Sequence, residues 1–243
     1  MICMRKILDM EKLHNKVIIS GFNKLTLLDY PGLTACIIFT QGCNYKCPFC
    51  HNASLIDSKA SGSYDEEEIL KFLIKRRNVL EGICISGGEP LMQKELVEFL
   101  IKIKDIGYKI KIDTNGSCPD ILKYLIDNKL IDYVAMDIKN DLDNYKKTAG
   151  ITNTDSVKKS IDILLNSDIG YEFRTTVVKE LHTVNNIINI AKMIKNTKKY
   201  YLQKFIDSGD IVSNNLHSFS DEEMLNIKKE IEKYIPTVEV RGI

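Results

Sequence analysis

The chain has 243 residues, of which 44% are hydrophobic and 28% are charged. Its 34 basic and 33 acidic residues leave a formal net charge of +1, which gives no sign of a nucleic-acid partner or an anionic membrane surface. No apolar run approaches the ~18 residues that cross a bilayer, and the N-terminal residues do not read as a secretory signal, so we expect a cytoplasmic protein with reduced thiols.

Runs with strand character alternate with amphipathic runs along the chain. The predicted strands cover residues 33–41, 82–86, 108–114, 133–139, 171–178 and 200–206. The predicted helices cover residues 65–80, 93–106, 120–129, 156–166, 184–195 and 221–234. Several of the strands are nearly continuous apolar runs, which is typical of parallel strands buried on both faces. Residues 17–21 and 238–241 are candidates for additional edge strands.

Strand–helix units in series predict a parallel sheet with right-handed crossovers. A complete eightfold barrel needs two more units than the six found here. We therefore expect an α/β fold, an incomplete (β/α)6 TIM-type barrel, in a single domain over residues 1–243, with its core at about 17–206 and a C-terminal helix and short strand in 207–243. Ser63 with Glu66, and Ser220 with Glu223, have the capping-box spacing that predicts helix starts.

Three of the seven cysteines lie in the segment QGCNYKCPFCHN (residues 41–52), directly after the first of these strands. Such a cluster indicates a metal site rather than a disulfide framework. Thiolates are the ligands of iron–sulfur clusters, and Cys43, Cys47 and Cys50 on a 4Fe-4S cube would leave one iron open, as a catalytic site requires. Zinc on these cysteines and His51 is the alternative, although the adjacent Cys50 and His51 reach one tetrahedral ion only with strain.

The C-x3-C-x-aromatic-C spacing, with Phe49 as the aromatic residue, resembles the signature of the radical S-adenosylmethionine (SAM) superfamily. The resemblance implies one 4Fe-4S cluster on Cys43, Cys47 and Cys50, with SAM as the second cofactor on the open iron. It also implies an oxidoreductase, in which one electron cleaves SAM to methionine and a 5′-deoxyadenosyl radical that abstracts hydrogen from the substrate.

A glycine-rich motif, GGEP (residues 87–90), follows the next predicted strand. Glycines at a strand end let the backbone approach a ligand closely, and a carboxylate there can pair with an amine. A plain strand-to-helix turn is the alternative. The motif resembles the GGEP of the radical SAM superfamily, which implies that Gly87, Gly88 and Glu89 bind the methionine amino group.

DTNG (residues 113–116) ends the following strand. Asn-Gly is by itself a turn signal. The motif also resembles the DTNG of glycyl-radical activating enzymes, which implies that Asp113, Thr114 and Asn115 bind the cofactor. Cys118 follows this turn and reads as an inert loop thiol, whereas Cys36 and Cys84 read as small core residues.

Charged and polar residues also mark the later strands. Alternation places Asp137 and Lys139 on one face, either as an ion pair or, by resemblance to the activating enzymes, against the cofactor. Arg174 lies inside a core strand and therefore requires an acidic partner or a ligand. His182, in the loop that follows, is a candidate cofactor contact or a solvent-exposed histidine, and Gln203 is a candidate cavity residue.

Two features narrow the reaction. The Cys50-His51-Asn52 ending resembles activases of glycyl-radical enzymes, and GFNKLTLLDYPG (residues 21–32) closely resembles the lead-in of anaerobic ribonucleoside-triphosphate reductase activating proteins. The resemblance implies that the enzyme removes hydrogen from a glycine Cα of that partner reductase, with an electron donor such as flavodoxin or ferredoxin.

Three alternatives remain open at the level of sequence. The partner of the activase could be a pyruvate formate-lyase type enzyme. The chain could instead be a small-molecule radical SAM enzyme like 7-carboxy-7-deazaguanine synthase, although the lead-in residues differ in that family. Outside this class, it could be a zinc-binding interaction protein on a strand–helix scaffold.

Overall fold

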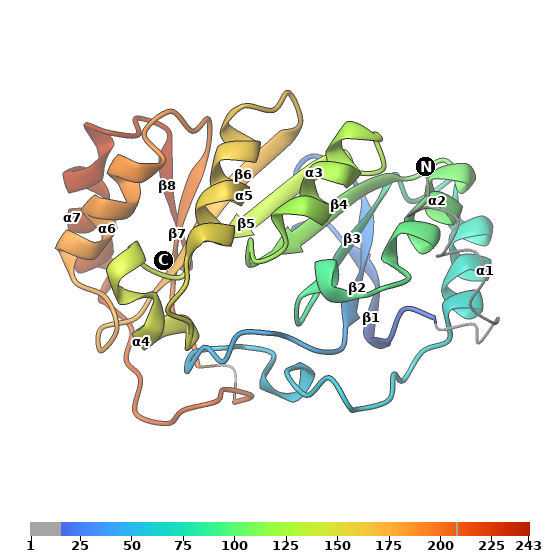
Figure 1. Cartoon of the computed structure of the whole chain (residues 1–243), viewed down its shortest axis with the longest axis horizontal. Coiled ribbons are helices and arrows are strands. Elements are labelled where there is room, and N and C mark those ends of the chain that lie inside the picture. Colours follow the sequence, from blue (N-terminus) through green and yellow to red (C-terminus); the bar gives the residue numbers. More distant parts are fainter. Residues whose placement is uncertain (1–15, 208) are drawn as a thin grey trace, which may run out of the picture.

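The computed structural model describes residues 16–207 and 209–243. Within them, the strands form one curved sheet in the order of the sequence (Figure 1). β1 pairs antiparallel with β2, and every later neighbouring pair is parallel. The strands are β1 (Ile19–Thr26), β2 (Ala35–Thr40), β3 (Gly82–Gly87), β4 (Lys109–Thr114), β5 (Tyr133–Asp137), β6 (Gly170–Val177), β7 (Tyr200–Lys204) and β8 (Val238–Arg241).

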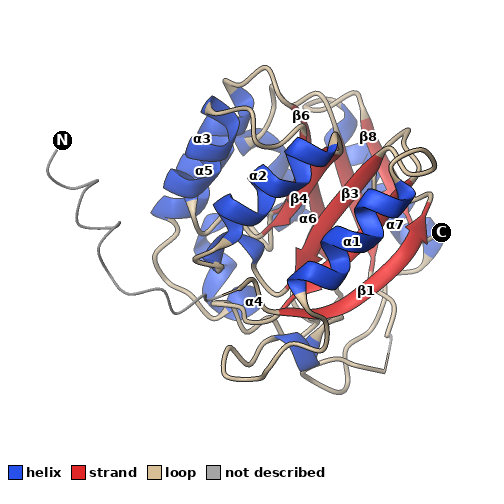
Figure 2. Ribbon diagram, turned by 90° about the vertical axis from the view of Figure 1, so that its right-hand side faces the viewer, coloured by secondary structure: helices blue, strands red, loops and turns tan. Residues whose placement is uncertain are grey.

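The long helices lie on the outer face of this sheet, as the two views show (Figures 1 and 2). No helix in the described part of the chain is both long and apolar enough to cross a membrane. The α-helices are α1 (Glu66–Arg76), α2 (Leu96–Ile106), α3 (Pro119–Asp127), α4 (Tyr145–Ala149), α5 (Asp155–Leu165), α6 (Val184–Met193) and α7 (Asp221–Glu232).

The structure confirms the expected α/β fold and its parallel sheet. The edge strand predicted at residues 17–21 begins at Ile19 and runs on to Thr26, and the strand predicted at 238–241 has those bounds. The capping box of Ser220 and Glu223 is present at the start of α7. At α1 the prediction was wrong, because Asp65 caps the helix by accepting from the Glu67 N–H. The Ser63 N–H donates instead to the Ile19 carbonyl.

The two faces of the sheet differ in chemistry, and β4 shows this most clearly. Ile110 and Ile112 are fully buried in the hydrophobic core. Lys111 and Asp113, which alternate with them, pair with each other on the concave face. The apolar core therefore lies between sheet and helices, where each buried large side chain contributes about 1.5–3 kcal/mol. The concave face is left for polar groups.

Gly88 allows the end of β3 to approach the cysteine-containing loop. Its N–H donates to the Thr40 carbonyl at 2.9 Å, and the next N–H, of Glu89, donates to the Gly42 carbonyl at 2.8 Å. A Cβ atom on Gly88 would lie 2.1 Å from the Gly42 oxygen, closer than any real contact. A side chain at this position would therefore separate the two segments.

We expect Gly88→Ala to lower the free energy of unfolding by about 2 kcal/mol or more, because backbone atoms must move to admit the methyl group. Gly107→Ala is the matched control. Gly107 ends α2 with a φ of +105° but has open space where a Cβ would be, so only the left-handed conformation is penalised, by about 1 kcal/mol. Urea unfolding of the iron-free protein measures the stability of both variants. Equal losses of stability would contradict the close approach of Gly88 to Gly42.

Candidate active site

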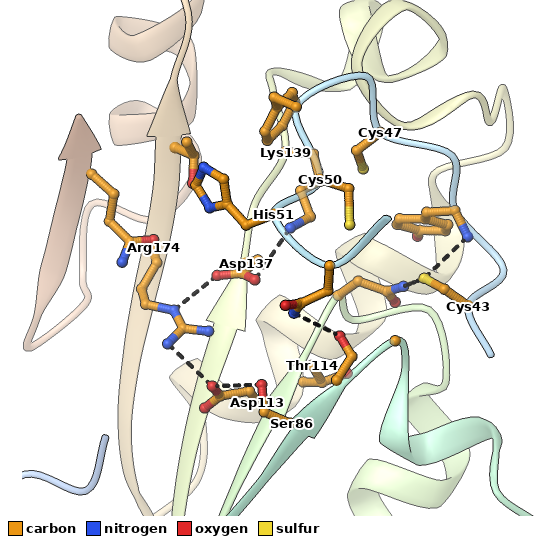
Figure 3. A pocket seen from close by; sticks show the side chains of 18 residues that line it. Cys43, Cys47, Cys50, His51, Ser86, Asp113, Thr114, Asp137, Lys139 and Arg174 are labelled. Atoms are coloured by element: carbon orange, nitrogen blue, oxygen red, sulfur yellow. Dashed lines mark hydrogen bonds and ion pairs between the residues drawn. The ribbon is translucent and has the colours of Figure 1, made fainter. Parts of the chain in front are cut away.

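The carboxyl ends of the parallel strands meet at one end of the sheet, which is where folds of this type carry their sites. A cavity of about 220 Å³ lies there (Figure 3). It is lined by every residue predicted from the sequence as a site residue except Glu89 and His182. The predicted residues that line it are Cys43, Cys47, Phe49, Cys50, Gly87, Gly88, Asp113, Thr114, Asn115, Asp137, Lys139 and Arg174.

The loop after β2 carries the three cysteines, and Figure 3 shows their sulfur atoms around one side of the cavity. Cys43 Sγ accepts a hydrogen bond from the Tyr45 N–H at 3.4 Å and from the Asn115 side-chain amide at 3.8 Å. The same Asn115 amide donates to Asn44 Oδ1 at 3.0 Å. The loop is thus tied to the end of β4 at its first cysteine.

Burial governs the chemistry of these thiols. It raises the pKa of Cys43, and it raises the pKa of Cys47 to about 12. Both thiols are therefore protonated at neutral pH in the iron-free protein, and a metal must displace their protons to bind. Within residues 16–207 and 209–243, no group of three or more cysteine, histidine, aspartate or glutamate side chains is placed to hold a single metal ion.

Five charged side chains of alternating sign connect β4, β5 and β6 beneath and beside the cavity. Lys111 pairs with Asp113, and Arg174 Nη1 lies 3.4 Å from Asp113 Oδ2. Arg174 Nε donates to Asp137 Oδ1 at 2.8 Å, and Lys139 Nζ donates to Asp137 Oδ2 at 3.2 Å. This set is called the charge chain below. It supplies the acidic partners that the position of Arg174 required, and it confirms that Asp137 and Lys139 share a face.

The cations of the charge chain keep its carboxylates ionised. Burial works against the ionised form of Asp137, but the charges of Arg174 and Lys139 outweigh it and hold its pKa below the usual range. Burial likewise opposes ionisation of Asp113, where Arg174 and Lys111 lower the pKa in the same way. The cavity therefore presents fixed carboxylates and fixed cations at neutral pH.

Glu89 lies behind the wall of the cavity and not in it. The side chain is fully buried; Oε1 accepts from Thr114 Oγ1 at 2.7 Å and Oε2 from the Asn115 N–H at 2.7 Å. Burial raises its pKa to about 7. Its carboxylate does not line the cavity, and its role toward the cofactor stays a prediction. Its position indicates that it holds the loop after β4, which in turn carries the Asn115 amide to Cys43.

His182 is likewise a buried structural residue, 2% exposed, and not the solvent-exposed alternative considered from sequence. Its Nδ1 accepts from the Val178 N–H at 3.1 Å, and its Nε2 lies 2.8 Å from the Lys139 carbonyl. Phe49 packs edge-on against the ring, with the centroids 6.2 Å apart. His182 thus fixes the backbone of Lys139 without lining the cavity.

Several lining residues were missed by the sequence-based prediction. Tyr45, His51 and Asn52 belong to the cysteine loop, while Ser86 and Thr176 come from β3 and β6. Strand alternation could have found Thr176, which lies two residues beyond Arg174. His51 was considered from sequence only as a zinc ligand and as part of the Cys50-His51-Asn52 ending; in the structure its ring stacks on Phe205 with the centroids 5.7 Å apart. Gln203, a candidate from sequence, does line the cavity.

A comparison with known protein families shows to which family the chain belongs. Residues 37–194, which contain the cysteine loop and the charge chain, match the family described as the radical SAM superfamily. The chain belongs to the radical SAM superfamily. Enzymes of this superfamily use a 4Fe-4S cluster together with SAM, and this chain is an oxidoreductase of that type.

Its relatives place this radical SAM enzyme in the glycyl-radical enzyme activating family. A protein of Methanocaldococcus jannaschii, named provisionally as a glycyl-radical enzyme activating enzyme, is 36% identical over 238 residues, which is 94% of this chain and 97% of the relative. The pyruvate formate-lyase-activating enzyme of Clostridium pasteurianum is 30% identical over 197 residues, covering 76% of this chain and 80% of the relative.

Solved structures agree on the radical SAM fold. Streptococcus suis SuiB bound to its precursor peptide SuiA has a TM-score of 0.68 at 17% identity, with 85% of this chain and 48% of SuiB covered. This chain thus spans about half the length of SuiB. A domain of pyruvate-formate lyase-activating enzyme from Bacteroides vulgatus has a TM-score of 0.54 at 18% identity, with 67% of this chain and 99% of that domain covered.

The residues around the cavity fit both cofactors. On one side, Cys43, Cys47 and Cys50 supply the thiolates that would hold the cluster. Asp113, Asp137, Lys139 and Arg174 line the same cavity with both signs of charge. Such a set suits the ammonium and carboxylate groups of the methionine part of SAM.

We expect Asp137→Asn to destabilise the iron-free protein at pH 7 by about 2 kcal/mol or more, because Arg174 and Lys139 lose a shared partner. The sign of the pH effect follows from the lowered pKa. The stabilisation by Asp137 is fully present above its unfolded pKa near 3.8 and is lost as the pH falls through its lower folded value. Urea unfolding from pH 7 to pH 2 should show a smaller loss on acidification in Asp137→Asn. If the free energy of unfolding fell equally with pH in both proteins, Asp137 would make no pH-dependent contribution to stability.

Proposed function

We propose that this enzyme generates a glycyl radical on a partner protein, and that the partner is an anaerobic ribonucleoside-triphosphate reductase. The observation that carries the proposal is the three-cysteine loop facing the charge chain across one cavity, in a chain that matches a provisionally named activating enzyme along nearly its whole length. The choice of the reductase rests on the resemblance of residues 21–32 to the lead-in of its activating proteins.

The residues have separate tasks in this proposal. Cys43, Cys47 and Cys50 would hold the cluster, and the charge chain would bind and orient the methionine part of SAM. When bound, the two cofactors supply the radical that removes a hydrogen atom from the Cα of the target glycine. Thr176 and Gln203, which line the cavity from β6 and β7, offer uncharged polar groups to an entering peptide. The electron would come from a small one-electron donor such as flavodoxin or ferredoxin.

A pyruvate formate-lyase type enzyme is the second candidate for the partner. It is favoured by the match to the Clostridium pasteurianum activating enzyme, which covers 80% of that protein. The chemistry at the cavity would be the same with either partner, because both reactions take a hydrogen atom from a glycine Cα. The two candidates therefore differ only in the protein that docks.

The direct test is anaerobic incubation of the iron-loaded enzyme with SAM, a reductant and each candidate partner, followed by electron paramagnetic resonance. We expect a glycine-centred doublet on the reductase and none on a reductase whose target glycine is replaced by alanine. A doublet on pyruvate formate-lyase alone would transfer the assignment to the second candidate. Cleavage of SAM with no radical on either partner would contradict both.

Cys47→Ala should reduce SAM cleavage to background, because it removes one of the three ligands that hold the cluster. Cys36→Ala is the matched control. Cys36 is a fully buried thiol of β2 in the hydrophobic core, so its loss should lower stability by about 1–2 kcal/mol with cleavage nearly intact. Release of 5′-deoxyadenosine, measured together with iron content, checks both variants. Normal release from Cys47→Ala would remove that residue from the ligand set.

A further inference from the structure

Tyr45 lies between the first two cysteines of the loop and has a hydroxyl group with nothing to bind. The residue is 3% exposed and lines the same cavity as Cys43 and Cys47. In the described part of the chain, its hydroxyl is one of two buried side-chain polar atoms without a hydrogen-bond partner. The other, Ser20 Oγ, belongs to β1 and does not line the cavity.

A buried hydroxyl without a partner is unfavourable by roughly 1–3 kcal/mol. Phenylalanine would fill the same space without that penalty. We therefore infer that the Tyr45 hydroxyl has a hydrogen-bond partner that is not part of the protein. An unpaired buried polar group calls for an explanation, and a redox role or a bound water or ion is among the recognised ones. Because Tyr45 lines the cavity, we infer that this partner is a group that binds there.

The position of Tyr45 selects which group this is. Its own N–H already donates to Cys43 Sγ at 3.4 Å, and Cys47 follows two residues later. Tyr45 thus belongs to the side of the cavity that carries the thiols. Among the charged groups that suit the methionine part of SAM, Asp113, Asp137 and Arg174 come instead from β4, β5 and β6, and Lys139 follows β5 (Figure 3).

We propose that the Tyr45 hydroxyl donates a hydrogen bond to a sulfur atom of the iron–sulfur cluster. Reduction adds negative charge to the cluster, so a donor aimed at its sulfur stabilises the reduced form more than the oxidised form. Hydrogen bonds to the sulfur atoms are one of the factors that set the potential of such clusters. Tyr45 therefore raises the reduction potential and makes delivery of the electron easier.

Tyr45→Phe tests this by removing a single oxygen atom. Tyr108→Phe is the matched control, because Tyr108 is also 3% exposed but its hydroxyl donates to the Leu73 carbonyl at 2.9 Å, remote from the cavity. In the iron-free full chain, Tyr45→Phe should leave the unfolding equilibrium unchanged or shift it toward the folded state. Tyr108→Phe should shift it about fivefold toward the unfolded state, as loss of one hydrogen bond predicts.

The second measurement uses the iron-loaded enzyme without SAM, at matched iron content, in a redox titration followed by electron paramagnetic resonance. Tyr45→Phe should make reduction about five- to tenfold less favourable, where tenfold equals about 59 mV for a one-electron couple. Tyr108→Phe should leave the potential unchanged.

Three results would overturn the proposal. An unchanged potential in Tyr45→Phe would show that the hydroxyl does not bind the cluster. An unchanged potential with weaker SAM binding would assign the hydroxyl to SAM instead. A loss of stability in the iron-free Tyr45→Phe variant as large as that of Tyr108→Phe would show that the hydroxyl has a partner within the protein.

Discussion

The site depends on the pairing of Arg174 with two carboxylates from two other strands. Arg174 lies opposite Asp137 in the register of β5 and β6 and reaches on to Asp113 of β4. Behind Asp113, Lys111 is 2% exposed and has no route to bulk water. Removing Asp113 or Asp137 would leave a buried cation, Lys111 or Lys139, without its carboxylate in the charge chain, which is strongly unfavourable. The ends of β4, β5 and β6 are consequently fixed relative to one another before any cofactor binds.

This arrangement also fixes the electrostatic character of the cavity. The charge chain has three cations and two carboxylates, so it carries a net charge of +1 beside the thiols. Three ionised thiolates would add negative charge to the same space. The charge chain thus places its surplus positive charge where that negative charge develops, and a low local dielectric strengthens the attraction.

Much of this architecture could be predicted from the sequence because it depends on local pattern. Strand ends, the cysteine spacing and the alternation of Asp137 with Lys139 are all properties of short segments. The direction of a loop side chain is not such a property. Glu89 was expected in the cavity because its motif follows a strand, but the tight turn at Gly88 sends the carboxylate toward Thr114 and Asn115. His182 was ambiguous for the same reason, since its burial depends on Lys139 and Val178.

The residues that most resemble reductase activases lie away from the cavity. β1 runs antiparallel to β2, so Thr26 pairs with Ala35 at the opposite end of the strand from the cysteine loop. There Thr26 donates to Asp29, and Tyr30 is buried beside Tyr133. These residues shape one end of the sheet and do not touch the reacting groups. These residues therefore contribute packing at one end of the sheet, while the cavity lies at the other end.

The cysteine loop is held by main-chain hydrogen bonds that do not involve its sulfur atoms. Gly42 donates to the Leu55 carbonyl and accepts from Glu89, and Lys46 donates to the carbonyl of Ala149 in α4. Small zinc-dependent domains, by contrast, unfold when their metal is removed. The bonds that hold this loop use backbone atoms of Gly42, Lys46 and Glu89, so none of them depends on the state of the thiols.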